Sequence, residues 1–219
     1  MVASPSLCSV HIGRIAPLGH EQVPSAFVKQ SVIGEIAVTP LGLEGDEQAD
    51  SEVHGGLEKA VYGYAMSRYP AWAREFPALA PSFKPGAMGE NLCINGMDEA
   101  TVCLGDVHAI GSTLLQVCQP RRPCIKLALR YDRKDLPDAM VRNGYSGWYY
   151  RVLRTGILAA GNLVALHDRP NPDFALSRFV EIANVGNGSE EELRRLANMA
   201  GLASKWLARA KKMLEEGKY

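Results

Sequence analysis

Short apolar runs separated by Gly and Pro occupy the chain from its start to about residue 168. Val10 and Ile12 alternate with polar neighbours, and Ile36 and Val38 do the same. Further runs at 102–104, 107–110, 114–117 and 163–166 are set off by Gly-led turn pairs at 105–106 and 111–112. Such alternation between turns is typical of strands, so this part predicts a mainly β fold, a barrel or a sandwich, with helices at its periphery.

Three stretches in the same part have helical spacing instead. Apolar side chains at positions 69, 72, 73 and 76 fall on one helical face, and Pro77 follows as a stop signal. Residues 125–130 and 136–142 show a similar pattern over a shorter length. We expect these segments to form the peripheral helices.

The pattern changes at Arg169-Pro170-Asn171-Pro172, a sequence typical of a linker. Before this point most of the predicted elements are strands, and beyond it the signals are helical. We therefore expect a β-barrel domain over residues 1–169 and a three-helix module over residues 170–219.

Local signals place the three C-terminal helices. Residues 173–183 predict the first helix, and Ser189 with Glu192 forms a capping box that starts the second. Gly201 suits the end of the second helix, and Ser204 the start of the third. Together they predict a compact helical module.

The composition is that of an ordinary globular protein. Lys plus Arg and Asp plus Glu number 24 each, so no net charge attracts the chain to nucleic acid or to an acidic membrane. Hydrophobic residues make up 47% of the chain, enough for a core. No apolar run could span a bilayer and the first residues lack signal-peptide features, so we expect a cytoplasmic protein with no membrane partner.

Five cysteines are scattered at positions 8, 93, 103, 118 and 124. Their odd number and the absence of a C-x-x-C pair argue against a disulfide framework, a zinc ribbon and a thioredoxin-like motif. We expect most of them to be small core residues and at least one to be a candidate reactive thiol.

The segment 41–56 is the richest in Gly and polar residues. Asp46, Asp50 and His54 are four residues apart, a spacing that on a helix would place metal ligands on one face. The alternative is a polar loop, which the glycines on either side favour. Gly55-Gly56 would allow a ligand close to the backbone, and Lys59 could meet an anion.

The segment 119–127 places Cys124 among Arg121, Arg122 and Lys126. Cations that point toward a thiol lower its pKa, and the resulting thiolate is a nucleophile or a soft metal ligand. The two guanidiniums would also suit a phosphate group. The alternative is an inert buried thiol beside Arg side chains that face solvent.

A third segment, Gly86-Ala87-Met88-Gly89-Glu90-Asn91-Leu92, predicts no more than a turn on its own. Taken together and in order, the three segments resemble the MOSC domain, and more closely its YiiM-like branch. The shared pattern is Asp46-x-x-x-Asp50-x-x-x-His54-Gly55-Gly56, then Met88-Gly89-Glu90-Asn91-Leu92, then Gln119-Pro120-Arg121-x-Pro123-Cys124-x-Lys126-Leu127. The stretch 69–77 and the helical tail match that branch too, so the resemblance covers nearly the whole chain.

The resemblance implies a β-barrel that binds the molybdenum cofactor, a pterin dithiolene with a terminal phosphate. It implies reduction of N-hydroxylated compounds, notably purine bases such as 6-hydroxylaminopurine, to amines, which detoxifies base analogues. Electrons would come from a flavin-containing reductase. Cys124, the expected catalytic residue, stands at the position of the cysteine that ligates molybdenum. The expected cofactor-binding residues are Asp46, His54, Gly55, Gly56, Lys59, Asn91, Arg121, Arg122 and Lys126.

Two other functions compete with this one. MOSC domains are also proposed to carry sulfur as a persulfide on the same cysteine, and a thiol of low pKa at Cys124 would suit that role. The tail, with Gly201 and the bases that follow Ser204, superficially resembles a helix-turn-helix. Neighbouring glutamates offset those bases, so we expect no nucleic-acid partner; the oligomeric state is open, with a homodimer as one alternative.

Overall fold

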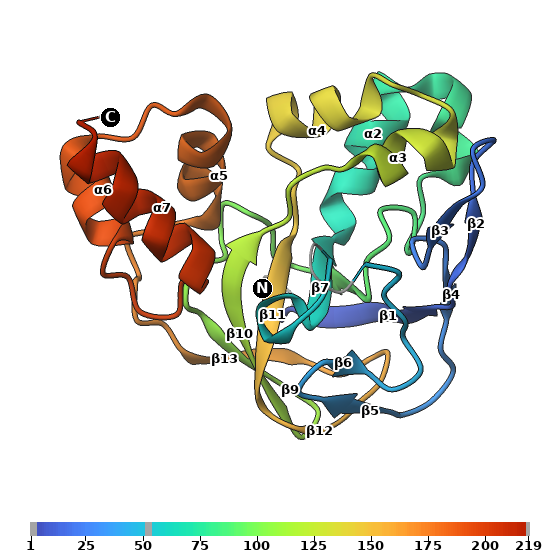
Figure 1. Cartoon of the computed structure of the whole chain (residues 1–219). Helices are drawn as coiled ribbons and strands as arrows, with labels where there is room; N and C mark the ends of the chain where they lie inside the picture. Colours follow the sequence, from blue (N-terminus) through green and yellow to red (C-terminus); the bar gives the residue numbers. More distant parts are fainter. Residues whose placement is uncertain (1–3, 51–53, 218–219) are drawn as a thin grey trace.

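The computed structural model describes residues 4–50 and 54–217 and shows a twisted sheet flanked by two groups of helices (Figure 1). Among the described residues, eight strands form the main sheet in the order β13-β9-β10-β11-β7-β8-β1-β4. These strands are β1 (Ser6–Gly13), β4 (Lys29–Ser31), β7 (Val61–Ala65), β8 (Leu92–Asn95), β9 (Val107–Ile110), β10 (Thr113–Pro120), β11 (Trp148–Arg154) and β13 (Val164–Asp168). Two smaller sheets contain β2 (Ala16–Leu18) with β3 (Val23–Ser25), and β5 (Ile36–Thr39) between β6 (Gly42–Leu43) and β12 (Gly156–Leu158).

Neighbouring strands in the main sheet are antiparallel except β7 and β8, which are parallel. Parallel neighbours need a long crossover. Here it contains η2 (Met66–Arg68), α2 (Tyr69–Glu75) and η3 (Pro77–Ser82). Helices α3 (Ile125–Tyr131) and α4 (Leu136–Asn143) lie beside α2, so the predicted peripheral helices are confirmed.

The sheet does not close into the expected barrel. The described strands leave β13 and β4 as its two edges, which do not pair with each other. The start of β1 contacts the residues around the start of β13 through an isolated bridge between Ser6 and Leu163 and a few backbone hydrogen bonds. Strand β1 divides its pairing, with β8 along its first half and β4 along its last three residues. A closed barrel requires one consistent register around the ring, and this division interrupts it. The fold is therefore a sheet-dominated mixture of strands and helices.

One predicted strand is a turn. Residues 102–104 make only an isolated bridge, between Cys103 and Ala175. The buried carboxylate of Asp106 accepts a hydrogen bond from the Cys103 backbone N–H at 2.9 Å, and the Val102 N–H donates to the Asp98 carbonyl. These local bonds satisfy the backbone inside a turn, so the apolar run is buried without joining the sheet.

The C-terminal part contains α5 (Leu176–Val185), α6 (Glu190–Leu196) and α7 (Ser204–Glu215), and Ser189 forms the predicted capping box. The first helix begins at Leu176 instead of 173, because Ala175 is extended and forms a bridge with Cys103, and the Phe174 carbonyl accepts from the Leu104 N–H. Gly201 does not end α6. Its φ is +83° and a Cβ there would lie 2.6 Å from the Gly105 Cα, so Gly201 allows close contact with the sheet domain.

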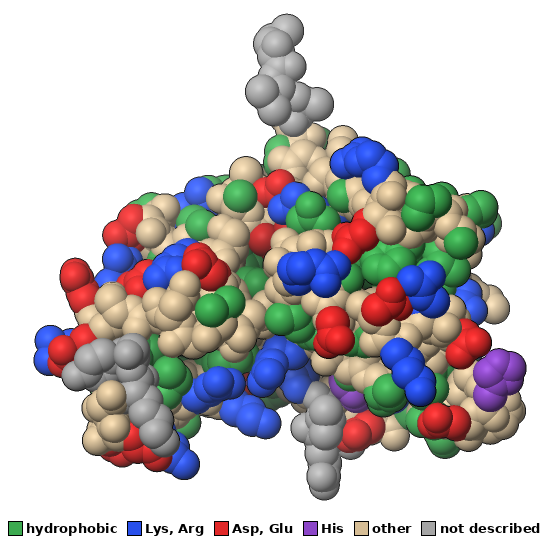
Figure 2. Space-filling view, turned by 90° about the horizontal axis from the view of Figure 1, so that it is seen from above, with side chains coloured by type: hydrophobic (Ala, Val, Ile, Leu, Met, Phe, Trp, Pro, Cys, Tyr) green, Lys and Arg blue, Asp and Glu red, His purple; other side chains and the backbone are tan. Residues whose placement is uncertain are grey.

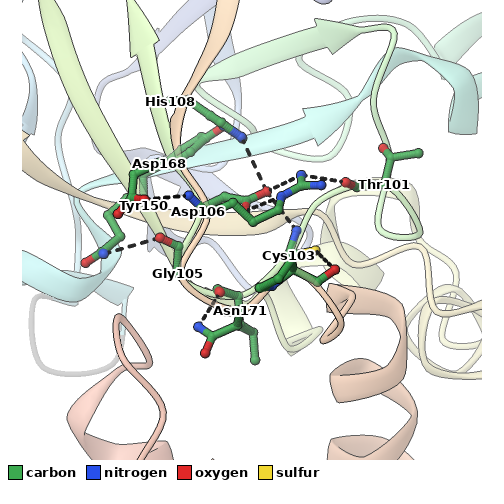
Figure 3. A network of polar contacts seen from close by, with 12 residues as sticks. Thr101, Cys103, Gly105, Asp106, His108, Tyr150, Asp168 and Asn171 are labelled. Carbon is green, nitrogen blue, oxygen red and sulfur yellow. Dashed lines mark hydrogen bonds and ion pairs between the residues drawn. The ribbon is translucent and has the colours of Figure 1, made fainter.

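The linker itself is held in place (Figure 3). Arg169 donates to both carboxylate oxygens of Asp106, at 2.8 and 2.7 Å, and to the Thr101 carbonyl. Asn171 donates to the carbonyls of Leu104 and Ala200, and so joins the two parts of the chain. One cluster of buried apolar side chains runs from the sheet into α5, α6 and α7. The helices are therefore packed on the sheet with a shared core.

A second apolar cluster lies between the sheet and helices α2, α3 and α4. It is rich in aromatic rings, with Trp72 at its centre within about 6 Å of Phe76, Phe83 and Tyr145. This cluster supports the segment 86–92 and the start of α3. Among the described residues, none of the helices combines the length and apolar character needed to cross a membrane.

Candidate active site

A pocket lies where β10 ends and the chain turns toward α3. It brings together segments that are far apart in the sequence, because the loop after β3, the turn before the short helix η1 (Leu57–Lys59) and the loop after β10 meet at this end of the sheet. Six of the polar residues that line it are Lys29, His54, Lys59, Arg121, Cys124 and Lys126. The pocket is therefore rich in cations around a single thiol.

Cys124 is the N-cap residue of α3, with an extended backbone (φ −132°, ψ 168°). Burial raises the pKa of its thiol. A side-chain hydrogen bond with His54, the charge of Arg121 and the backbone N–H of Lys126 outweigh burial and lower the pKa to about 6. At pH 7 about nine tenths of such a group is thiolate. The sequence prediction of an activated thiol and its cation neighbours agrees with this geometry.

Asp46 and Asn91 line the pocket, but their polar groups hold its wall together. Asp46 Oδ1 accepts from the Gly13 N–H at 2.6 Å and from Lys29 Nζ at 2.5 Å. Asp46 Oδ2 accepts from Asn91 Nδ2 at 2.8 Å, and Asn91 Oδ1 accepts from the Tyr62 N–H at 3.0 Å. The sequence predicts that both residues bind a cofactor; in the structure both have these protein partners, and their roles toward a cofactor stay predictions.

The spacing of Asp46, Asp50 and His54 does not build a metal site. The Asp46 carboxylate points into the Lys29 pair, whereas His54 hydrogen-bonds Cys124. Residues 46–50 are not helical, and the intervening residues 51–53 lie outside the described part of the chain. Among the described residues, no group of three or more His, Cys, Asp or Glu side chains is placed to hold a metal ion.

Arg121 is buried and contacts several parts of the pocket. It donates to the Met88 carbonyl, which anchors the 86–92 turn against the pocket. Its guanidinium lies over the Tyr62 ring, 4.6 Å from the centroid, and 5.2 Å from the Phe27 centroid. Because its charge also acts on Cys124, Arg121 connects the turn, the aromatic wall and the thiol.

The other predicted residues divide into two sets. Lys59 and Lys126 line the pocket, as expected for residues that would meet an anion. Arg122 is exposed, and neither it nor Gly55 and Gly56 is among the described residues that line the pocket. Their roles toward a cofactor stay predictions.

A cation from the C-terminal helices reaches the same place. Burial lowers the pKa of Lys59, and the nearby charge of Lys205 lowers it further. Helix α7 is fixed there because Glu58 accepts from the Ser204 N–H at 2.9 Å and from its hydroxyl at 2.9 Å. Figure 2 shows Lys and Arg side chains gathered along the lower edge of the molecule. The tail thus places one cation near Lys59.

Sequence reasoning missed Lys29, Lys205 and the aromatic residues of the pocket. Tyr62 and Tyr149, from adjacent strands β7 and β11, place their rings 5.3 Å apart. No local motif marks these residues, because strand pairing brings them to the pocket. The one available signal was the aromatic run 148–150, whose middle residue faces away from its two neighbours in a strand.

Residues 50–165 match the family model of the MOSC domain. The chain belongs to the MOSC family. Protein YiiM of Escherichia coli (strain K12) is 39% identical over 198 residues, which cover 90% of this chain and 88% of that protein. The crystal structure of YiiM from Geobacillus stearothermophilus superposes with a TM-score of 0.81 at 28% identity, over 96% of this chain and 99% of the other. This MOSC protein therefore lies in the YiiM-like branch.

A third relative carries a functional name. A protein of Gibberella moniliformis named "Reductase" is 37% identical over 186 residues, 84% of this chain and 33% of that longer protein. Within this MOSC protein, the family match includes His54, Lys59 and Cys124, while Lys29 precedes it and Lys205 follows it. The pocket is thus lined by the MOSC domain and by residues that precede it, and Lys205 lies near its Lys59.

Proposed function

We propose that this MOSC protein is a molybdenum-cofactor-dependent reductase that converts N-hydroxylated compounds, in particular N-hydroxylated purine bases such as 6-hydroxylaminopurine, to their amines. The observation that carries the proposal is Cys124, a thiol with a pKa of about 6 inside a pocket rimmed by cations. Family membership and the relative named "Reductase" support it.

The residues present suit this cofactor. A thiolate is a soft ligand, appropriate to a metal that already has two dithiolene sulfurs. Lys59 and Lys126 line the pocket, and Lys205 stands near Lys59, so an anionic phosphate would find positive charge at the rim. The cofactor, when bound, supplies the two-electron redox chemistry, and the chain supplies binding, orientation and charge.

The protein's own groups would then act on the substrate. The partly exposed ring of Tyr149, which packs against the buried Tyr62, would offer flat apolar surface to a planar purine. His54 hydrogen-bonds Cys124 inside the pocket, where its imidazole could hold or pass a proton toward a bound substrate. Reduction of R–NHOH to R–NH2 and water consumes two electrons and two protons. We propose that a flavin-containing reductase delivers the electrons.

The same thiolate would also suit a persulfide carrier, so the test must separate the two functions. Molybdenum per chain is measured by elemental analysis in protein from a host that makes the cofactor, beside Cys124→Ser. Near-stoichiometric metal in the parent protein, with hydroxylaminopurine reduction that the variant lacks, is the expected result. Cyanide-labile sulfur on Cys124 in a protein that never acquires molybdenum would overturn the proposal in favour of sulfur transfer.

A further inference from the structure

Three sulfur atoms from separate elements meet on the β1–β8 side of the sheet, apart from the Cys124 pocket. Cys8 lies on β1, Cys93 on β8, and Met66 starts the short helix η2 that follows β7. Cys93 is fully buried, Met66 is half-buried and Cys8 is exposed. The group therefore runs from the surface into the core.

A β-bulge brings the two thiols together. Leu7 pairs with Ile94 and Ser9 with Cys93, so Cys8 is an extra residue of β1 between them. In a bulge two residues of one strand share one partner across the ladder. Cys8 and Ser9 thus share Cys93 as their partner across the ladder, and the Cys8 and Cys93 thiols are close enough for each to act on the pKa of the other.

The thioether completes the group. Cys93 Sγ lies 3.6 Å from Met66 Sδ. Two metal–sulfur bonds of about 2.3 Å span that distance at an angle of roughly 103° at the metal, which is near the tetrahedral value. One ion could therefore bind both atoms with little movement. Behind them Ser9 pairs with Cys93 across the ladder, and the His11 ring lies 2.7 Å from the Ser9 hydroxyl. Such outer partners orient metal ligands.

We propose that Cys8, Cys93 and Met66 form a binding site for a soft monovalent metal ion of the Cu(I) class. Two thiols and a thioether, with no carboxylate among them, are the ligands that select Cu(I) over harder ions. Binding replaces the two S–H protons, which leave to solvent, and no change of oxidation state is involved. Exposed Cys8 provides the entry point. This site is independent of the function proposed for Cys124.

The experiment is an anaerobic Cu(I) titration against the chromogenic chelator bicinchoninate. It uses reduced Cys124→Ser protein, so that the pocket thiol does not contribute. We expect one tightly bound Cu(I) per chain, with affinity lowered at least about tenfold by an added Cys8→Ser and less by Met66→Leu. Cys103→Ser, at another buried thiol, should leave the affinity unchanged and is the matched control.

X-ray absorption at the copper edge reports the ligands directly. A first shell of sulfur alone is expected in the Cys124→Ser protein. The proposal is overturned if that protein retains no Cu(I) against the chelator, if folded Cys8→Ser binds as tightly as its parent, or if the shell is nitrogen or oxygen. Cys8 is exposed and Met66→Leu nearly conserves volume, so both variants should fold.

Discussion

Two thiols six residues apart, one inside β10 and one just beyond its end, have opposite chemistry. Cys118 is enclosed within the sheet and donates to the carbonyls of Glu58 and Tyr149, and burial raises its pKa to about 12. Cys124 is also largely removed from solvent, yet its pKa falls to about 6. At Cys118 burial outweighs the nearby charge of Arg151, whereas at Cys124 the His54 hydrogen bond and the charge of Arg121 outweigh burial, so the balance of the two effects decides whether a thiol is reactive.

The largest expected effect comes from removing the reactive thiol. Cys124→Ser should reduce turnover of an N-hydroxylated purine to the level of the enzyme-free control, because serine supplies no soft thiolate. Cys118→Ser keeps a donor for the same carbonyls and should remain active. Alkylation by iodoacetamide, followed by mass spectrometry from pH 4 to 9, should show Cys124 reacting with a midpoint near 6. Equal reactivity of the two thiols at pH 7 would contradict the comparison.

A large stability effect is expected at the wall that supports the pocket. The Lys29–Asp46 pair is buried, with side chains 7% and 4% exposed. Lys29→Met leaves the Asp46 carboxylate without its charge partner and should cost about 3–5 kcal/mol in free energy of unfolding. Urea denaturation measures this. Arg14→Met, which breaks the exposed Arg14–Glu47 pair of the same segment, is the control and should change the unfolding curve little.

The two thiols should also give opposite pH dependence of stability. Cys124 has a folded pKa below its unfolded value, so its contribution is present above pH ~8.5 and is lost as the pH falls through about 6. Cys118 has a raised pKa, so its contribution is complete below pH ~8.5 and declines as the pH rises toward 12.

Denaturation at several pH values tests this difference. The stability gap between the parent protein and Cys124→Ser should widen by about 2 kcal/mol from pH 6 to 8.5, after allowance for partial solvent screening. The gap between the parent and Cys118→Ser should not widen over the same interval. A constant gap for Cys124→Ser would show that the thiol is not ionised in the folded protein.

The smallest expected effect lies at the rim. Lys205→Ala removes one cation near Lys59 and should weaken the binding of inorganic phosphate to the pocket by about two- to fivefold at low salt, with less difference at high salt. Equilibrium dialysis measures the affinity. Lys211→Ala, an exposed lysine farther along α7, is the matched control. Identical phosphate affinities for the two variants would show that the C-terminal helices do not contribute to binding in the pocket.

Local pattern was a good guide to single elements. The alternating runs correspond to β1, β5, β9, β10 and β13, and the helical spacings to α2, α3 and α4. The strand predicted at residues 102–104 is wrong, because the Asp106 side chain accepts a hydrogen bond from the Cys103 backbone and so stabilises a turn there. The barrel expectation failed because closure depends on how β1 divides its pairing, and no short window of sequence contains that information.

Several residues of the candidate site could likewise be predicted from local sequence, whereas their contacts could not. The polar segments identified His54, Lys59, Arg121, Cys124 and Lys126, all of which line one pocket. The same reasoning did not foresee that Lys29 and Asn91 donate hydrogen bonds to the carboxylate of Asp46. Residue type predicts what a side chain can bond to, and only its neighbours in space decide which bond it makes.

The sequence by itself determined the periodic elements, the capping of α6 and the presence of a thiol among cations, because each depends on residues a few positions apart. The tertiary structure decided the rest. It pairs Asp46 with Lys29 in the pocket wall and places Lys205 of the tail near Lys59. It also lowers the pKa of Cys124 below 7 and raises that of Cys118 well above 7. The physical reason is that electrostatic interactions and burial depend on distances in space, and for residues far apart in the sequence only the tertiary fold sets those distances.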